Sequence, residues 1–118
     1  FEKRVLALVN AERRRRGIAP LRASGCAGEH AAEWSQRLAR RDRLGHQKLA
    51  ALRDDCGARR AGENVGMTVG TPERMFARWM ASARHRKQLL DARYTHVGVG
   101  AARAASGRWY AVKNFLAF

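Results

Sequence analysis

The spacing of apolar residues changes once along this chain of 118 residues, and that change constrains the fold more than any other feature. Up to about residue 90, apolar side chains recur every three or four positions, which is the period of an amphipathic helix. From Val97 onward they alternate with glycine or polar residues, as in a strand, and Ser106-Gly107 supplies a turn between two such runs. Helices first and an antiparallel hairpin last predict an α+β fold in which helices cover the sheet.

Capping and turn signals divide the helical part of the chain into segments. Ser24 is a candidate N-cap, and Thr71 followed by Pro72 is a strong helix start. The predicted helices are residues 2–16, residues 25 to about 43, residues 48–54, a helix from Pro72 to about residue 81, and a last turn after Ser82 that ends near Leu90.

The length of the chain fits one domain, residues 1–118, with a single core. Cys26 and Cys56 lie 30 positions apart, with no second Cys or His at zinc-finger spacing and no CxxC pair. A disulfide is their simplest use; it would stabilise the fold by ~3–4 kcal/mol on the chain-entropy model and would imply an oxidising compartment. Two buried free thiols are the alternative.

The chain is strongly basic, with 24 Lys and Arg against 10 acidic residues and a net charge of +14. Such a surface attracts polyanions such as anionic lipid or a cell-wall polymer. The alternative is that the arginines are only solvated cations. The cations form no recognised nucleic-acid-binding motif, so nucleic acid is not expected as a partner, and Arg13 to Arg16 fall where cations suit the end of a first helix. No apolar run is long enough to span a membrane, and we expect a monomer.

Short blocks in one order along the chain resemble the CAP superfamily, also called SCP-like, which includes cysteine-rich secretory proteins, antigen 5 and plant pathogenesis-related proteins. The match is closest to the short bacterial members and runs from about Val5 to Phe118. The blocks are Leu44-Gly45-His46, Gly62-Glu63-Asn64-Val65, Trp79 with Ser82-Ala83-Arg84-His85-Arg86, Val97-Gly98-Val99-Gly100, and Trp109-Tyr110-Ala111-Val112-Lys113-Asn114-Phe115. The resemblance implies a secreted protein with an α-β-α sandwich, its helices packed around a small antiparallel sheet. The chain begins at Phe1 with no leader, so we expect that any secretion signal was removed or lies outside this sequence.

The resemblance also implies a central cavity lined by two histidines and two acidic residues. His46, Glu63 and His85 match three of these positions, and Ser82 stands where eukaryotic relatives carry a glutamate. A divalent cation, zinc first, would then be held weakly by His46, His85 and water, with Glu63 as a further candidate ligand. From the residues alone, two other roles stay open: histidines that lock helices to the sheet, and a helix cap at Ser82.

Three functions follow from these residues, and binding is favoured over catalysis. The first is a secreted binding protein with this cavity and a basic surface for an anionic or lipidic partner. The second is a metal-assisted hydrolase in which Glu63 acts as general base on water bound at His46 and His85. The chain has no HExxH helix and lacks the second acidic residue, which argues against it. The third is a plain extracellular interaction module. His30 is interpreted as a solvated or paired side chain at the surface, and His96 as a structural residue.

Overall fold

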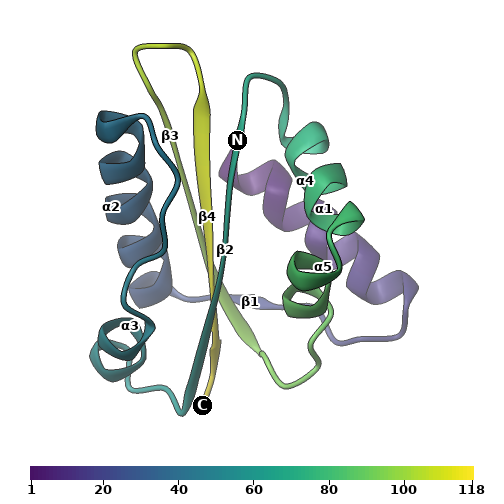
Figure 1. Ribbon diagram of the computed structural model, residues 1–118. Coiled ribbons are helices and arrows are strands. Elements are labelled where there is room, and N and C mark those ends of the chain that lie inside the picture. Colours follow the sequence, from purple (N-terminus) through teal and green to yellow (C-terminus); the bar gives the residue numbers. More distant parts are fainter.

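The computed structural model describes residues 1–118 as five helices and four strands (Figure 1). In chain order these elements are α1 (Glu2–Arg15), β1 (Arg22–Ala23), α2 (Gly25–Arg41), α3 (Leu49–Asp55), β2 (Arg60–Thr68), α4 (Pro72–Ala81), α5 (Ala83–Leu89), β3 (His96–Arg103) and β4 (Trp109–Ala117).

The four strands form one sheet in the order β1-β3-β4-β2. The C-terminal hairpin of β3 and β4 is antiparallel, with Val97 opposite Phe115, and β2 pairs antiparallel with the other side of β4. The two-residue β1 runs parallel to β3, so the sheet is mixed rather than purely antiparallel. β2 is therefore an edge strand.

Helices cover both faces of the sheet, which confirms the predicted α+β class and its α-β-α layering. Figure 1 shows α2 and α3 on one face and α1, α4 and α5 on the other. On the second face, a core that includes Val5, Trp79 and Phe115 joins these helices to the sheet. On the first face, Leu38 of α2 packs in a second core with Val112 of β4.

The predicted helix starts are confirmed by their caps. The Ser24 hydroxyl accepts a hydrogen bond from the Ala27 amide at 3.1 Å, and the Thr71 hydroxyl accepts one from the Arg74 amide at 3.2 Å. The second helix ends slightly earlier than expected, because Asp42 takes a left-handed conformation with φ of 51°. This stops the helix before Gly45.

Glycines in β3 allow α2 to lie directly on the sheet. A Cβ atom built at Gly98 would collide with the backbone of Ala27 and Gly28 in α2, and one at Gly100 would collide with the backbone of Ala31. The alternation of valine and glycine in this strand thus serves close helix packing. Helix α2 would have to move outward for any larger side chain.

Two strands were missed at the level of the sequence. The segment that became β2 contains glycine, glutamate and asparagine, which are depleted in strands, so it gave no strand signal. It forms a strand because β4 offers a complete antiparallel ladder and because the polar side chains find partners from distant parts of the chain. β1 is too short for a periodic pattern.

The predicted disulfide is confirmed. Cys26, at the start of α2, is bonded to Cys56, which follows α3, and the Cα atoms are 5.7 Å apart. The bond ties the two helices of one face together. No free cysteine remains.

The basic run at the end of α1 is not a uniform solvated patch. The Arg13 side chain is buried, and its guanidinium donates hydrogen bonds to four backbone carbonyls. These belong to Ala19 at 2.8 Å, Leu89 at 2.9 Å, Tyr94 at 3.1 Å and Asp91 at 3.2 Å. Arg13 therefore fixes the segment that joins α5 to β3, while Arg14, Arg15 and Arg16 remain exposed.

Candidate functional site

A cavity of about 550 Å³ opens along the edge strand β2, between the α2–α3 connection and α5. Neighbouring residues of a strand point to opposite faces, so Glu63 points toward the α2–α3 side and Asn64 toward the α5 side. The edge strand thus contributes to both walls. The lining residues are Leu44, Gly45, His46, Gln47, Leu49, Glu63, Asn64, Val65, Arg84, His85 and Gln88.

Glu63 is buried and already paired. Its side chain is only 1% exposed, one carboxylate oxygen lies 2.6 Å from Nδ1 of His46, and the other accepts a hydrogen bond from Gln47 at 2.6 Å. Gln47 also donates to Asn114 of β4 at 2.8 Å. A buried carboxylate needs such partners, since an unpaired charge would be costly to bury.

The pairing selects one tautomer of the His46 ring. A carboxylate only accepts hydrogen bonds, so Nδ1 carries the proton and donates it to Glu63, and Nε2 keeps its lone pair in the neutral ring. The His46 side chain is 56% exposed, so the ring is reachable from solvent. Its loop is held by Trp34 of α2, whose indole N–H donates to the Gly45 carbonyl at 2.9 Å.

His85 enters the cavity from α5. The Asn64 side chain donates to the backbone carbonyl of His85 at 3.2 Å and so ties α5 to the edge strand. Burial lowers the pKa of the His85 ring, and the charges of Lys113 and Arg84 act in the same direction. The neutral imidazole is therefore favoured.

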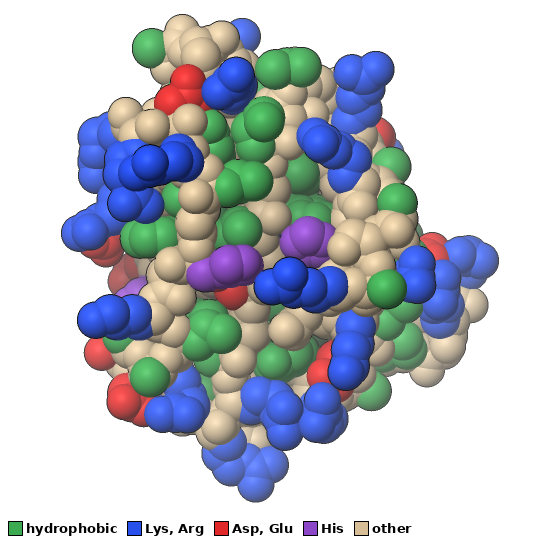
Figure 2. Space-filling view, in the orientation of Figure 1, with side chains coloured by type: hydrophobic (Ala, Val, Ile, Leu, Met, Phe, Trp, Pro, Cys, Tyr) green, Lys and Arg blue, Asp and Glu red, His purple; other side chains and the backbone are tan.

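The two histidines are not equivalent. His46 also lowers the pKa of His85 through its charge, so the rings are near enough to interact. Figure 2 shows two histidine side chains close together at the centre of this face, with acidic atoms just below one of them. Glu63 orients His46, whereas Nδ1 of His85 is buried and has no hydrogen-bond partner.

The structure thus brings His46 and Glu63 into direct contact and puts His85 in the opposite wall of the same cavity. Ser82 does not line this cavity. It lies between α4 and α5, where it occupies the N-cap position of α5 without a side-chain cap hydrogen bond. His96 lies on β3, beside the Phe118 ring.

Gln47 and Lys113 complete the surroundings of the cavity and were not picked out as site residues from the sequence. Gln47 follows His46 directly, and no spacing rule marks it. Lys113 is fully buried on β4, opposite Asn64, and its amino group has no hydrogen-bond partner. The sequence signal that could have marked Lys113 as buried is its place among apolar residues in a strand with alternating side chains.

A family model described as the cysteine-rich secretory protein family, CAP, matches residues 6–115. The chain belongs to this family. The match includes all of the blocks on which the resemblance rested, from His46 to Phe115. The helix-covered sheet is the fold of this family.

Two proteins of Bacillus subtilis are similar to this CAP chain in sequence. The uncharacterized protein YkwD is 33% identical over an alignment 113 residues long, which covers 90% of this chain and 44% of YkwD. The uncharacterized membrane protein YlbC is 30% identical over 122 residues, 98% of this chain and 34% of YlbC. The chain therefore spans less than half the length of these relatives.

Solved structures share the CAP fold. An extracellular protein with an SCP domain from Bacillus anthracis superposes with a TM-score of 0.87 at 22% identity, over 99% of this chain and 40% of that one. An outer surface protein of Borrelia burgdorferi gives 0.88 at 14% identity, over 98% and 90%. These similarities show the fold. None of the helices in this chain is long and apolar enough to cross a membrane.

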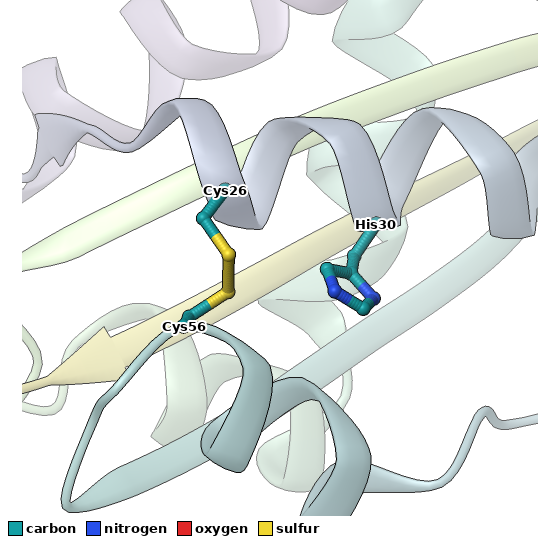
Figure 3. A group of neighbouring side chains, drawn as sticks. All are labelled: Cys26, His30 and Cys56. Carbon is teal, nitrogen blue, oxygen red and sulfur yellow. A yellow bond between two sulfur atoms is a disulfide. The ribbon is translucent and has the colours of Figure 1, made fainter.

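One further cluster of metal-binding side chains was missed by the sequence reasoning. Ligand atoms of Cys26, His30 and Cys56 all lie within 4.8 Å of one another (Figure 3). In the disulfide, the two sulfurs are bonded to each other and are not free thiolates. The spacing of four between Cys26 and His30 on one helix was the signal that could have found the cluster.

Proposed function

We propose that this CAP chain is an extracellular binding domain whose central cavity holds a divalent cation and whose arginine-rich surface holds an anionic partner. The observation that carries the first part is the hydrogen bond between Glu63 and Nδ1 of His46. Histidines that bind metal almost always donate their other ring nitrogen to a carboxylate or carbonyl. The ring of His46 is oriented in this way.

His46 and His85 would hold the ion, and water would complete its coordination. Imidazole nitrogens suit zinc, and the burial that favours neutral His85 keeps a lone pair available. The ligand atoms of His46, Glu63 and His85 do not form a three-ligand cluster, so Glu63 orients His46 rather than binding the ion. Bound zinc would act as a Lewis acid and as a tie between the two walls.

The charges around the cavity favour weak binding. Arg84 lines the same wall as His85, and Lys113 lies close enough to lower the pKa of that ring. The only acidic residue of the cavity lining, Glu63, is already paired with His46. Little negative charge is left to offset a dication.

Hydrolysis is less well supported than binding. A general base must reach a water molecule, and both carboxylate oxygens of Glu63 are occupied by His46 and Gln47 in a buried position. No second carboxylate lines the cavity. Binding therefore remains the function that these residues support best.

The surface supports an anionic partner. Figure 2 shows Lys and Arg side chains spread over the visible face, with few acidic ones among them. Three hollows are each lined by three arginines, and guanidinium groups bind phosphate in a bidentate manner. The sets are Arg74, Arg78 and Arg108; Arg37, Arg40 and Arg41; and Arg59, Arg60 and Arg93.

Of these hollows, the one with Arg74 fits an anionic lipid best. It measures about 590 Å³, and its lining includes Val69, whose side chain is the most exposed of the large apolar residues. Cations beside an exposed apolar residue suit a headgroup and the start of its chain. Extracellular placement is supported by the disulfide and by the extracellular and outer-surface proteins that share the fold.

Calorimetric titration of the chelator-treated, oxidised protein with zinc tests the metal site. We expect binding by wild type that is lost in His46→Ala and His85→Ala and that weakens near pH 5, where imidazoles become protonated. His96→Ala is the matched control, because His96 lies outside the cavity. Equal zinc binding by all four proteins, or no zinc binding by wild type, would show that the cavity residues have a structural role and do not bind the metal.

Vesicle binding tests the surface. We expect binding to vesicles that contain phosphatidylglycerol, none to neutral vesicles, and a steep loss between about 50 and 200 mM salt. Replacement of Arg74, Arg78 and Arg108 by Gln should weaken binding more than the same change at three exposed arginines outside the hollows, Arg14, Arg22 and Arg53. Salt-independent binding would instead indicate an apolar contact.

A further inference from the structure

A group of potential metal ligands lies apart from the central cavity, where α2 meets the end of α3. Its members are Cys26, His30 and Cys56, all half-buried. We propose that reduction of the Cys26–Cys56 disulfide converts this group into a zinc site, with Asp55 as the fourth ligand. The disulfide and the zinc ion are then two mutually exclusive ways of joining α2 to α3.

The fold already positions the side chains for this role. Cys26 and His30 are four residues apart on α2, so they lie on one face of the helix one turn apart. Figure 3 shows both side chains directed toward the end of α3, where Cys56 meets them. Two ligands from α2 and one from the C-cap of α3 therefore converge in the folded backbone.

The separation of the two cysteines suits a common ion. Tetrahedral zinc holds thiolates at about 2.3 Å, which places two such sulfurs roughly 3.8 Å from each other. The Cα atoms of Cys26 and Cys56 are 5.7 Å apart. Once the sulfurs are no longer bonded, rotation about the Cα–Cβ bonds brings them to that spacing while the helices stay in place.

Asp55 is the nearest source of a fourth ligand, but its carboxylate lies outside the 4.8 Å group and would have to turn toward the sulfurs. Its carboxylate lies 3.3 Å from Nε2 of His30. A nitrogen and an oxygen bound to one tetrahedral zinc ion at 2.0–2.2 Å lie roughly 3.4 Å apart. The pair is thus already at the spacing that zinc would require, and Asp55 is exposed, so its side chain is free to adjust.

The chemistry of the four ligands differs from that of the central cavity. Two thiolates with an imidazole and a carboxylate favour zinc among the common divalent ions, and thiolates bind it strongly. The central pair, His46 and His85, offers only nitrogen and has cations beside it. We therefore expect the reduced cluster to bind zinc more tightly than the cavity.

The conversion balances in two steps. A dithiol gives two electrons and two protons to the sulfur–sulfur bond and becomes a cyclic disulfide. A phosphine gives two electrons and becomes the phosphine oxide with the oxygen of one water molecule, whose two protons complete the two thiols. Zinc binding then releases both thiol protons, because the thiolate is the ligand. Bound thiolates are no longer free to attack an oxidant, so zinc should also slow re-formation of the disulfide.

The test uses the full chain in a His85→Ala background, which removes the proposed cavity site. Oxidised protein and protein reduced with a phosphine are each incubated with zinc, desalted and analysed for metal. We expect one more equivalent of zinc in the reduced protein, and with cobalt a thiolate charge-transfer band in the near ultraviolet. Re-oxidation by oxidised glutathione should be at least about tenfold slower with zinc.

His30→Ala should leave the oxidised protein folded and should weaken zinc binding by the reduced protein at least about tenfold. His96→Ala, a histidine outside the cluster, should change neither. If the reduced chain unfolds when no metal is present, zinc must restore the near-ultraviolet circular dichroism of the folded state in the reduced protein that keeps His30, and must not restore it in reduced His30→Ala. Equal zinc content before and after reduction, or equal affinity with and without His30, would overturn the proposal, whatever the cavity binds.

Discussion

The amino group of Lys113 lies 3.7 Å from the centre of the Trp79 ring and has no hydrogen-bond partner. Lys113 is fully buried on β4. A cation over an aromatic ring gains about 2 kcal/mol or somewhat more in a dry site, whereas removing the charge from water costs several kcal/mol. Desolvation is therefore the larger effect, and burial holds the pKa of Lys113 well below its usual range.

Lys113→Met should stabilise the protein by about 1–3 kcal/mol near neutral pH, because methionine fills similar space without a buried amine. Since the pKa is lowered on folding, the lysine binds its proton less readily in the folded state than in the unfolded one. Stability of the wild type is thus lost as pH falls below the unfolded value of about 10.4, so the advantage of Lys113→Met should be larger near pH 7 than near pH 10.

Urea unfolding of both proteins at the two pH values measures this difference. Met75→Leu, a swap of similar volume in the same core, controls for general repacking. A destabilised Lys113→Met protein would show that the amine contributes more to the fold than its burial costs.

Arg13→Met should destabilise the protein by at least about 3 kcal/mol. The guanidinium donates hydrogen bonds to four carbonyls, and without it the buried carbonyls of Leu89 and Tyr94 would lose this donor. Arg14→Met is the matched control, because Arg14 is exposed on the next position of α1, and it should change stability by no more than about 0.5 kcal/mol. Equal effects in thermal unfolding would contradict the structural role of Arg13.

Glu63→Gln should weaken zinc binding to the oxidised protein by roughly 10–100-fold, the range for losing the partner that orients a metal-binding histidine. An amide does not supply the negative charge that holds the proton on Nδ1 of His46. Glu33→Gln on the exposed face of α2 should bind zinc as wild type does. Calorimetry measures both, and unchanged affinity in Glu63→Gln would mean that His46 does not depend on this carboxylate.

The sequence predicted elements with local signals and missed those that depend on distant partners. The α4 start at Thr71 and the C-terminal hairpin were predicted because caps and alternation act over a few residues. β2 gave no such signal, since Glu63 is satisfied by His46, 17 residues away, and Asn64 by the His85 carbonyl, 21 residues away. Periodicity carries no information about such pairs.

The candidate site shows the same limit. Family resemblance, not spacing, brought His46, Glu63 and His85 together as candidates, because they lie on a loop, a strand and a helix. Arg13 was interpreted as part of a charged helix end, although it is buried. The Arg13 guanidinium is buried where four acceptors converge on it, and these are backbone carbonyls of residues between 19 and 94.

The packing of α2 on β3 leads to a last prediction about two glycines, one on each element. Gly98→Ala should cost about 3 kcal/mol or more, because its Cβ would collide with the backbone of Ala27 and Gly28, which cannot rotate away as a side chain can. At Gly28 of α2 an added Cβ meets nothing within 4 Å, so Gly28→Ala should stabilise the helix by up to about 1 kcal/mol. Denaturant unfolding of the two variants compares the same added methyl group inside the contact between α2 and β3, at Gly98, and outside it, at Gly28. If Gly98→Ala were as stable as Gly28→Ala, α2 would not pack on β3 as closely as these positions indicate. The hydrogen bond from the Asn114 side chain to the Ala27 carbonyl, 3.3 Å long, would then not hold α2 against the sheet either.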